Sequence, residues 1–253
     1  MNYSPHPINV KETFDKFVQE FGGELVRNLL PKNKDIPLNA DYLFSKESII
    51  AELKCLEKND YGSKELEKKF NTIHSKWIRN GLVKPGQINT RAIDVPQLPL
   101  RCQNDLFKLT GRQIIGHIDK ANGQIKETKK SLEIPDAKGL LLLVNDGNYL
   151  LEHGLALQFI ARRLKPAYTS IDKFVYFTVN LRALSPNGNM VKVWFDAHSR
   201  ENVNEISDTF TNSLRREWLS FMQMKTGETF IETELQSIEA IDKLMLIKRS
   251  TDK

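Results

Sequence analysis

The stretch DYLFSKESIIAELKC, residues 41–55, decides the fold because two apolar runs in it are separated by a polar turn. Residues 41–44 and 48–56 are rich in the aromatic and branched side chains that favour strands, and residues 45–47 are polar. Two strands joined by so short a connection pair most simply with each other, in opposite directions. The stretch therefore predicts an antiparallel β-hairpin.

The charged residues of this hairpin are arranged as a site. Successive side chains of a strand point to opposite faces, so Glu52 and Lys54 project together from one face of the second strand. The carboxylate of Asp41, on the partner strand, can converge on the same point. Two carboxylates and a main-chain carbonyl form an oxygen site suited to Mg²⁺, which supports phosphodiester hydrolysis. The hairpin therefore predicts Asp41 and Glu52 as metal ligands and Lys54 as the group that orients or activates the attacking water.

Two long helices are expected on either side of an insertion. Apolar residues recur at three- and four-residue steps over 10–30, which predicts an amphipathic helix. Residues 57–80 are charged and helical in pattern, and residues 81–105 mix prolines and glycines with other residues and favour a loop. A second long helix is expected over 111–132. We therefore interpret residues 57–110 as an insertion of a helix plus a loop.

The second half of the chain predicts a parallel strand pair. The run LLLLV at 140–144 is uninterrupted, as expected for a central strand that is covered on both faces. A helix over 149–164 and another buried strand over 174–179 follow, an order that predicts a right-handed crossover. Residues 185–189 predict a turn, and residues 190–195 a strand that pairs back. The class expected is α/β, with a mixed sheet flanked by helices.

The length of 253 residues favours one large domain, and a final helix is expected from about residue 203 to 224. We expect a single domain over 1–253, with a core at about 10–56 and 111–200, the insertion at about 57–110, and a helical C-terminal extension at about 203–253.

Composition excludes several classes of protein. With 40% hydrophobic and 27% charged residues, wholesale disorder is not expected. The sequence contains no run of 18 apolar residues, so no membrane span is predicted. The N-terminus lacks a signal-peptide pattern, and the expected location is cytoplasmic. Cys55 and Cys102 form neither a zinc motif nor a disulfide framework. The net charge of +5 is mildly favourable for a polyanionic partner.

The order Asp, spacer, Glu-x-Lys resembles the PD-(D/E)XK nuclease superfamily, which has the restriction-endonuclease-like fold. Ten residues separate Asp41 from Glu52, and Ala40 replaces the proline that names the motif. The resemblance covers about residues 10–180, less the insertion. It implies a core of helix, three-stranded meander, helix and strand, with the motif on the second and third strands. We therefore expect a restriction-endonuclease-like mixed sheet flanked by helices, with a helical insertion after the Glu-x-Lys strand and a short or displaced first meander strand.

The resemblance also implies two assisting residues. Family members often use a Glu of the first helix in metal binding, and Glu24 lies within the apolar stripe of the predicted helix, with Glu20 as the reserve. An ion pair at the rim of the stripe is an equal alternative for Glu24. Related nucleases often place a Gln or Lys of the helix after the Glu-x-Lys strand near the scissile phosphate, and Gln124 matches that location.

The function implied by the resemblance is Mg²⁺-dependent cleavage of DNA, with Mn²⁺ able to substitute, by a restriction-type or defence endonuclease. A repair or recombination nuclease is the alternative of the same kind. Two other classes stay open: a non-cleaving nucleic-acid-binding or assembly subunit with the same fold, and an unrelated α/β protein whose Glu-x-Lys is a solvated edge-strand face. A homodimer would suit cleavage of both strands of a duplex.

Overall fold

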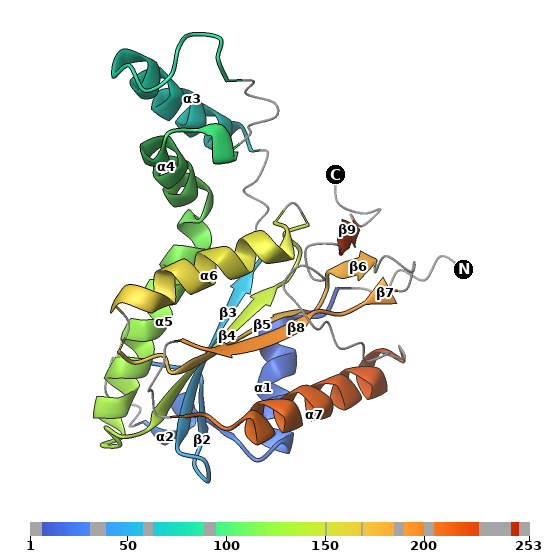
Figure 1. Cartoon of the computed structure of the whole chain (residues 1–253). Helices are drawn as coiled ribbons and strands as arrows, with labels where there is room; N and C mark the ends of the chain where they lie inside the picture. The colour runs from blue at the N-terminus through green and yellow to red at the C-terminus, as the bar shows by residue number, and fades with distance from the viewer. Residues whose placement is uncertain are drawn as a thin grey trace.

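The computed structural model describes residues 7–30, 39–57, 63–88, 95–149, 151–167, 169–184, 190–199, 205–227 and 244–247. Over these residues the chain is an α/β protein with a six-stranded mixed sheet of order β1-β2-β3-β4-β5-β8, with helices on both faces (Figure 1). The six strands are β1 (Glu24–Leu25), β2 (Tyr42–Phe44), β3 (Ile49–Leu56), β4 (Lys138–Asn145), β5 (Lys173–Thr178) and β8 (Trp194–His198).

The pairing of the strands confirms the predicted hairpin and the predicted parallel pair. Strands β1, β2 and β3 form an antiparallel meander, and Tyr42 pairs with Ala51. Strands β3, β4 and β5 are parallel, and β8 closes the sheet antiparallel to β5. The strand predicted over 190–195 is divided, because β7 (Met190–Val191) joins a second sheet and only the residues from Trp194 pair with β5.

Each face of the sheet is covered by two helices. One face packs against α5 (Arg112–Ser131) and α6 (His153–Ala167), and the other against α1 (Val10–Glu20) and α7 (Asp208–Thr226). Residues of β3 alternate between these two cores: Ile50 and Leu56 belong to the first, and Ala51, Leu53 and Cys55 to the second. Burial of each large apolar side chain contributes about 1.5–3 kcal/mol. The even-numbered residues of β3 therefore face α5, as the alternation predicts.

The helix predicted over 10–30 is wrong beyond Glu20. The chain turns at Gly22, whose φ of +92° favours glycine, and enters β1 and the short helix α2 (Val26–Leu29). At Gly23 a Cβ atom would lie 2.7 Å from side-chain atoms of Phe44 and Val18, so the backbone approaches the core too closely for another residue. Pairing of Glu24 and Leu25 with β2 replaces the helical hydrogen bonds expected from the periodicity.

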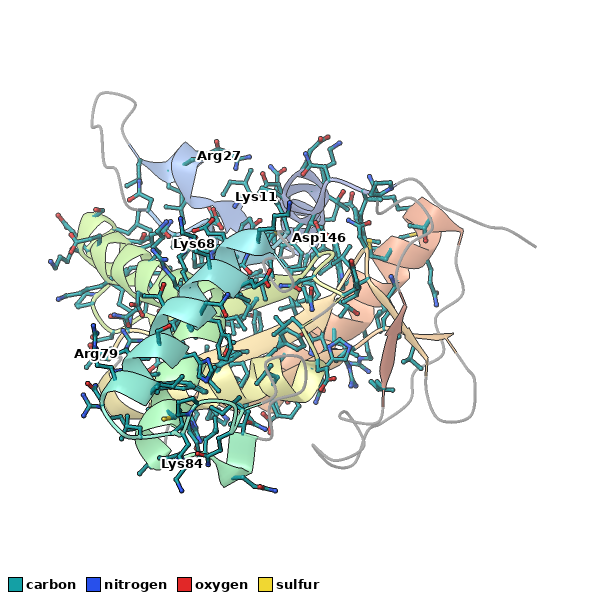
Figure 2. All side chains as sticks on the ribbon, turned by 90° about the horizontal axis from the view of Figure 1, so that it is seen from above. Lys11, Arg27, Lys68, Arg79, Lys84 and Asp146 are labelled. Atoms are coloured by element: carbon teal, nitrogen blue, oxygen red, sulfur yellow. The ribbon has the colours of Figure 1, made fainter. Side chains whose placement is uncertain are left out.

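Between β3 and α5 the chain forms a helical arm, defined here as residues 63–88 and 95–110. It contains α3 (Lys64–Arg79), a 3₁₀ turn (Val95–Gln97) and α4 (Leu100–Thr110), so the loop predicted over 81–105 is wrong from residue 100. Trp77 is the centre of a small apolar core shared by α3 and α4. The arm projects beyond the sheet in Figure 1, and Figure 2 shows the basic side chains of Lys68, Arg79 and Lys84 along it.

The C-terminal part differs from the predicted helical extension. Helix α7 begins at Asp208 after Ser207, whose side chain accepts a hydrogen bond from the Phe210 N–H. Strand β9 (Met245–Ile247) then pairs with β6 (Arg182–Leu184) in the second sheet, of order β7-β6-β9. The predicted turn at 185–189 lies outside the described residues. None of the helices in the described ranges is long and apolar enough to cross a membrane.

Candidate active site

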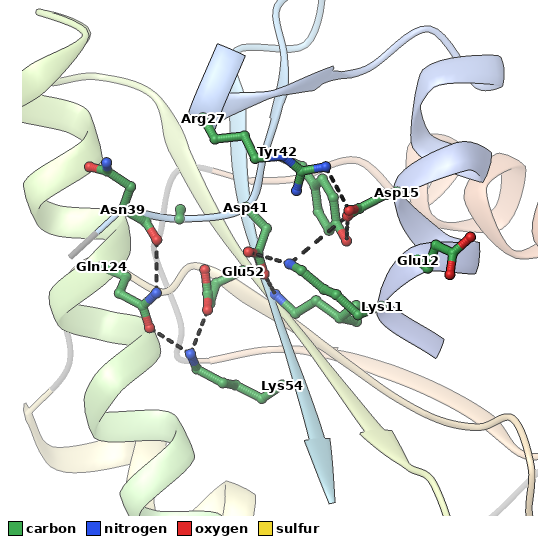
Figure 3. A network of polar contacts seen from close by, with 12 residues as sticks. Lys11, Glu12, Asp15, Arg27, Asn39, Asp41, Tyr42, Glu52, Lys54 and Gln124 are labelled. Carbon is green, nitrogen blue, oxygen red and sulfur yellow. Dashed lines mark hydrogen bonds and ion pairs between the residues drawn. The ribbon is translucent and has the colours of Figure 1, made fainter. Parts of the chain in front are cut away.

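The register of β2 and β3 brings the two predicted carboxylates together. Tyr42 pairs with Ala51, so the next antiparallel position places Asp41 opposite Glu52. Asp41 is held there by its own N–H, which donates to the Ala51 carbonyl (3.2 Å), and by its Oδ2, which accepts from the Leu53 N–H (3.0 Å). Figure 3 shows the two carboxylates side by side on the face of the sheet that meets α5.

Glu52 is an unusual carboxylate because it lies among apolar residues. Its side chain is 2% exposed, and one oxygen, Oε2, is buried without a hydrogen-bond partner in the described part of the chain. Burial, followed by repulsion from the Asp41 carboxylate, raises the pKa of Glu52 to about 7. Buried acceptors are normally satisfied, so this oxygen is open to a further hydrogen-bond donor or a cation.

Lys54 connects the Glu52 carboxylate to α5. Its ammonium donates to Glu52 Oε1 (2.5 Å) and to Gln124 Oε1 (2.6 Å). The Gln124 side chain is fixed in turn, because its Nε2 donates to the Asn39 carbonyl (2.8 Å). The structure thus brings together four of the five predicted site residues, Asp41, Glu52, Lys54 and Gln124, in one network (Figure 3).

Glu24, the fifth residue, lies elsewhere. It belongs to β1 instead of the first helix, is exposed, and accepts a hydrogen bond from Ser45 Oγ (2.5 Å). Among the described residues, Glu24 is not one of the hydrogen-bond or ion-pair partners of Asp41, Glu52 or Lys54. Its role as a metal ligand stays a prediction.

A second layer of charge, contributed mainly by α1, surrounds Asp41, and the sequence did not reveal it. Lys11 forms an ion pair with Asp41, and its ammonium lies 4.9 Å from the centre of the Tyr42 ring. Asp15 accepts from the Tyr42 hydroxyl (2.8 Å) and from the Arg27 guanidinium (2.8 Å). Nothing in the pattern of α1 distinguishes Lys11 from an ordinary solvated lysine, because the contact depends on how the helix docks on the sheet.

The donor set fits a hard divalent cation. Mg²⁺ is usually bound by one or two carboxylates together with waters, and Asp41 and Glu52 supply two. Glu52 Oε2, which has no hydrogen-bond partner in the described part of the chain, is available for such a cation. No cluster of three or more His, Cys, Asp or Glu side chains suited to a metal occurs in the described ranges. Carboxylate oxygens are ligands that Mg²⁺ prefers, whereas zinc takes four ligands in structural sites, mostly from Cys and His.

Comparison with known proteins identifies no relative: no protein-family model, curated protein or solved structure matches this chain. The site is therefore interpreted from its own residues.

Proposed function

We propose that the chain is a Mg²⁺-dependent nuclease that hydrolyses phosphodiester bonds of DNA at the Asp41–Glu52–Lys54 site. The observation that carries the proposal is the placement of the Asp41 and Glu52 carboxylates on neighbouring strands. Among the described residues, Glu52 Oε2 is buried without a hydrogen-bond partner, and the Lys54 ammonium lies 2.5 Å from Glu52 Oε1. Structural ion pairs are usually satisfied on both sides, whereas a metal-dependent hydrolytic site needs open acceptors.

The order of elements supports the resemblance to the PD-(D/E)XK superfamily. Helix α1 is followed by the meander β1-β2-β3, then by α5 and β4, and the two-residue β1 is the short first strand that the resemblance requires. Asp41 directly precedes β2, the second strand of the meander, and the Glu-x-Lys lies on β3, the third strand. We infer a restriction-endonuclease-like core with the arm as its insertion. A restriction or defence role is the setting that this family implies, and a repair or recombination role is the alternative.

The residues have separate roles in the proposed reaction. Asp41 and Glu52 would hold Mg²⁺, which supplies polarisation of the phosphoryl oxygen and of a bound water. Lys54 places its positive charge beside the reacting phosphate, where it stabilises developing negative charge and orients the attacking water. Gln124 is a positioning residue: its amide is anchored on the Asn39 carbonyl and fixes the Lys54 ammonium. Because burial raises the pKa of Glu52 to about 7, metal binding would release a proton from this carboxyl near neutral pH.

The test is cleavage of supercoiled and linear DNA with Mg²⁺ or Mn²⁺ over a series of enzyme concentrations. We expect Asp41→Asn and Glu52→Gln to abolish metal-dependent cutting, because each variant removes one ligand charge while keeping shape. Glu127→Gln is the matched control, since Glu127 is a carboxylate of α5 paired with Lys130 (2.9 Å) away from the site. Glu24→Gln tests the remaining predicted ligand.

Cutting that survives both Asp41→Asn and Glu52→Gln would disprove the proposed site. Absence of cutting by the folded wild-type protein on every DNA form, together with salt-sensitive DNA binding, would favour the non-cleaving binding or assembly subunit.

A further inference from the structure

A pocket lined by polar and apolar side chains lies on α5, the helix that also carries Gln124 of the candidate active site. It has a volume of about 480 Å³ and lies where the arm joins α5, between the first turns of α3, the end of α4 and the first half of α5. This volume is within the range of sites that hold small organic ligands. The residues that line it serve no role in the proposed hydrolysis.

The charged side chains of the pocket are mostly basic. Three cations, Lys69, Arg112 and Lys120, line it together with one carboxylate, Glu65, so that the charged lining sums to +2. Glu65 is ion-paired with Lys69. Arg112 and Lys120 are exposed at the rim on α5. An anionic group that enters from solvent would therefore meet two cations on one helix. Arginine and lysine are the side chains that commonly contact the phosphates of nucleic acids.

The interior of the pocket is neutral and offers hydrogen-bonding groups. Burial, assisted by the Lys54 and Lys120 ammonium groups, lowers the pKa of His117 to about 4, so that its ring is uncharged at neutral pH. Gln113 Oε1 is buried and lacks a hydrogen-bond partner among the residues that the structure describes. Leu66 and Leu109 supply apolar surface. Neutral donors and acceptors beside apolar side chains are suited to a nucleobase.

The pocket and the catalytic network share helix α5. His117 lies seven residues before Gln124 on α5, which is two helical turns and about 10 Å along the helix axis. The Lys54 ammonium is close enough to His117 to contribute to the lowering of its pKa. A ligand chain that reaches Lys54 could therefore extend into the pocket within a few nucleotides.

We propose that this pocket binds one nucleotide of the substrate strand near the phosphodiester to be cut, with its base against Gln113 and His117 and its two flanking phosphates on Arg112 and Lys120. The proposal rests on the proposed function, because it assigns the substrate of the same site. It also gives the arm a role, because residues of α3 and α4 line the pocket together with α5.

The first experiment measures binding of a fluorescent single-stranded oligonucleotide in EDTA, where cleavage cannot occur, as a function of salt. Arg112→Gln and Lys120→Gln should each reduce the slope of log K against log salt by about 0.7, the value expected when one fewer phosphate of a single strand is neutralised. Lys130→Gln is the charge-matched control, since Lys130 lies at the far end of α5 and pairs with Glu127. It should keep the wild-type slope.

The second experiment fills the pocket without changing charge. Gly116 lines the pocket, and a Cβ atom there would meet nothing within 4 Å. Gly116→Leu should weaken oligonucleotide binding about tenfold by occupying the space of the base. Gly116→Ala is the control, because it changes helix propensity in the same direction but leaves the pocket open.

The outcomes separate the two proposals. Wild-type slope and affinity in Arg112→Gln, Lys120→Gln and Gly116→Leu, in a protein that cuts DNA, would overturn the pocket while the nuclease stands. If these variants bind more weakly but the wild-type protein never cuts DNA, the result would support nucleotide binding by the pocket and disprove the nuclease activity. Binding of a free nucleoside monophosphate that Gly116→Leu abolishes, with oligonucleotide binding unchanged, would overturn the assignment to a strand.

Discussion

Lys54 of β3 and Lys173 of β5 each direct an ammonium group from the sheet toward a helix that covers it, α5 for Lys54 and α7 for Lys173. The partners of the two ammonium groups differ. Lys173 is 1% exposed and contacts Asp208 (2.6 Å), Asp196 (2.9 Å) and Thr211 (3.0 Å). An ammonium has three protons, so each has an acceptor. The three acceptors come from β8 and α7, and the Lys173 ammonium lowers the pKa of the Asp208 carboxyl. This cluster ties α7 to the sheet.

The Lys54 ammonium, by contrast, has fewer acceptors than protons among the described residues. In the described part of the chain, Lys54 donates to two acceptors, Glu52 and Gln124, and its side chain is 15% exposed. Glu52 keeps one buried oxygen without a donor, and burial raises the pKa of this carboxyl to about 7. A lysine such as Lys173, with an acceptor for every ammonium proton, stabilises the fold. The Lys54 cluster has unfilled hydrogen-bonding positions, which are suited to a bound ligand.

The largest expected effect is on cleavage. Lys54→Met should reduce the rate of DNA cutting about 10²- to 10³-fold, the usual loss when one group that stabilises transition-state charge is removed. Lys173→Met should leave the rate per folded molecule near that of the wild type, because Lys173 contacts only structural partners. Rates are measured below the unfolding transition, with the folded fraction taken from circular dichroism. Equal losses in the two variants would remove the distinction between the clusters.

The reverse order is expected for stability. Lys173→Met should lower the free energy of unfolding by about 2 kcal/mol, because it removes the ammonium donor shared by the buried Thr211 hydroxyl and the largely buried Asp196 carboxylate, whereas the exposed Asp208 stays solvated. At pH 6, Glu52→Gln should change stability by less than about 1 kcal/mol, because the amide is neutral like the protonated carboxyl and still accepts from Lys54. Urea denaturation at that pH measures both. A loss below about 1 kcal/mol for Lys173→Met would contradict the structural role.

A dependence of stability on pH should distinguish Glu52 from an ordinary ion-paired carboxylate. Its pKa is about 7 in the folded protein and about 4.5 when unfolded, so the folded state binds more protons between these values. Stability contributed by this group is therefore present below pH 4.5 and is lost as pH rises through 7, a change of about 3 kcal/mol. Glu52→Gln in EDTA should lack this component. A wild-type and a variant curve of the same shape over pH 4.5–8 would show that Glu52 titrates normally.

The smallest expected effect is stabilisation by metal. At a Mg²⁺ concentration ten times the dissociation constant, the wild-type protein should gain about 1.4 kcal/mol, because Mg²⁺ binds only the folded state. Glu52→Gln should gain nothing, and Lys173→Met should gain as much as the wild type. Thermal unfolding with and without Mg²⁺ measures the difference. Equal stabilisation of the wild type and Glu52→Gln would place the metal elsewhere.

The parts of the fold that could be predicted depend on local patterns. The hairpin of β2 and β3 and the apolar strand β4 were predicted close to their observed bounds, because alternation and apolar runs within a few residues specify them. The helix predicted to continue to residue 30 was wrong, because pairing of Glu24 and Leu25 with β2 outweighs the helical periodicity. Helix α4 was missed because its buried residues Cys102 and Leu106 face the small core around Trp77, and only Phe107 reaches the main core, where it packs on Phe159 of α6.

The sequence by itself determined that Glu52 and Lys54 share a face and that Asp41 can lie opposite, because both follow from the period of a strand and a short turn. Only the tertiary structure decided what that face meets. Gln124 reaches Lys54 across 70 residues of sequence, and α5 together with β4 buries Glu52 so that its pKa rises. Burial and the field of distant charges depend on how helices dock on the sheet, and no local pattern contains that information.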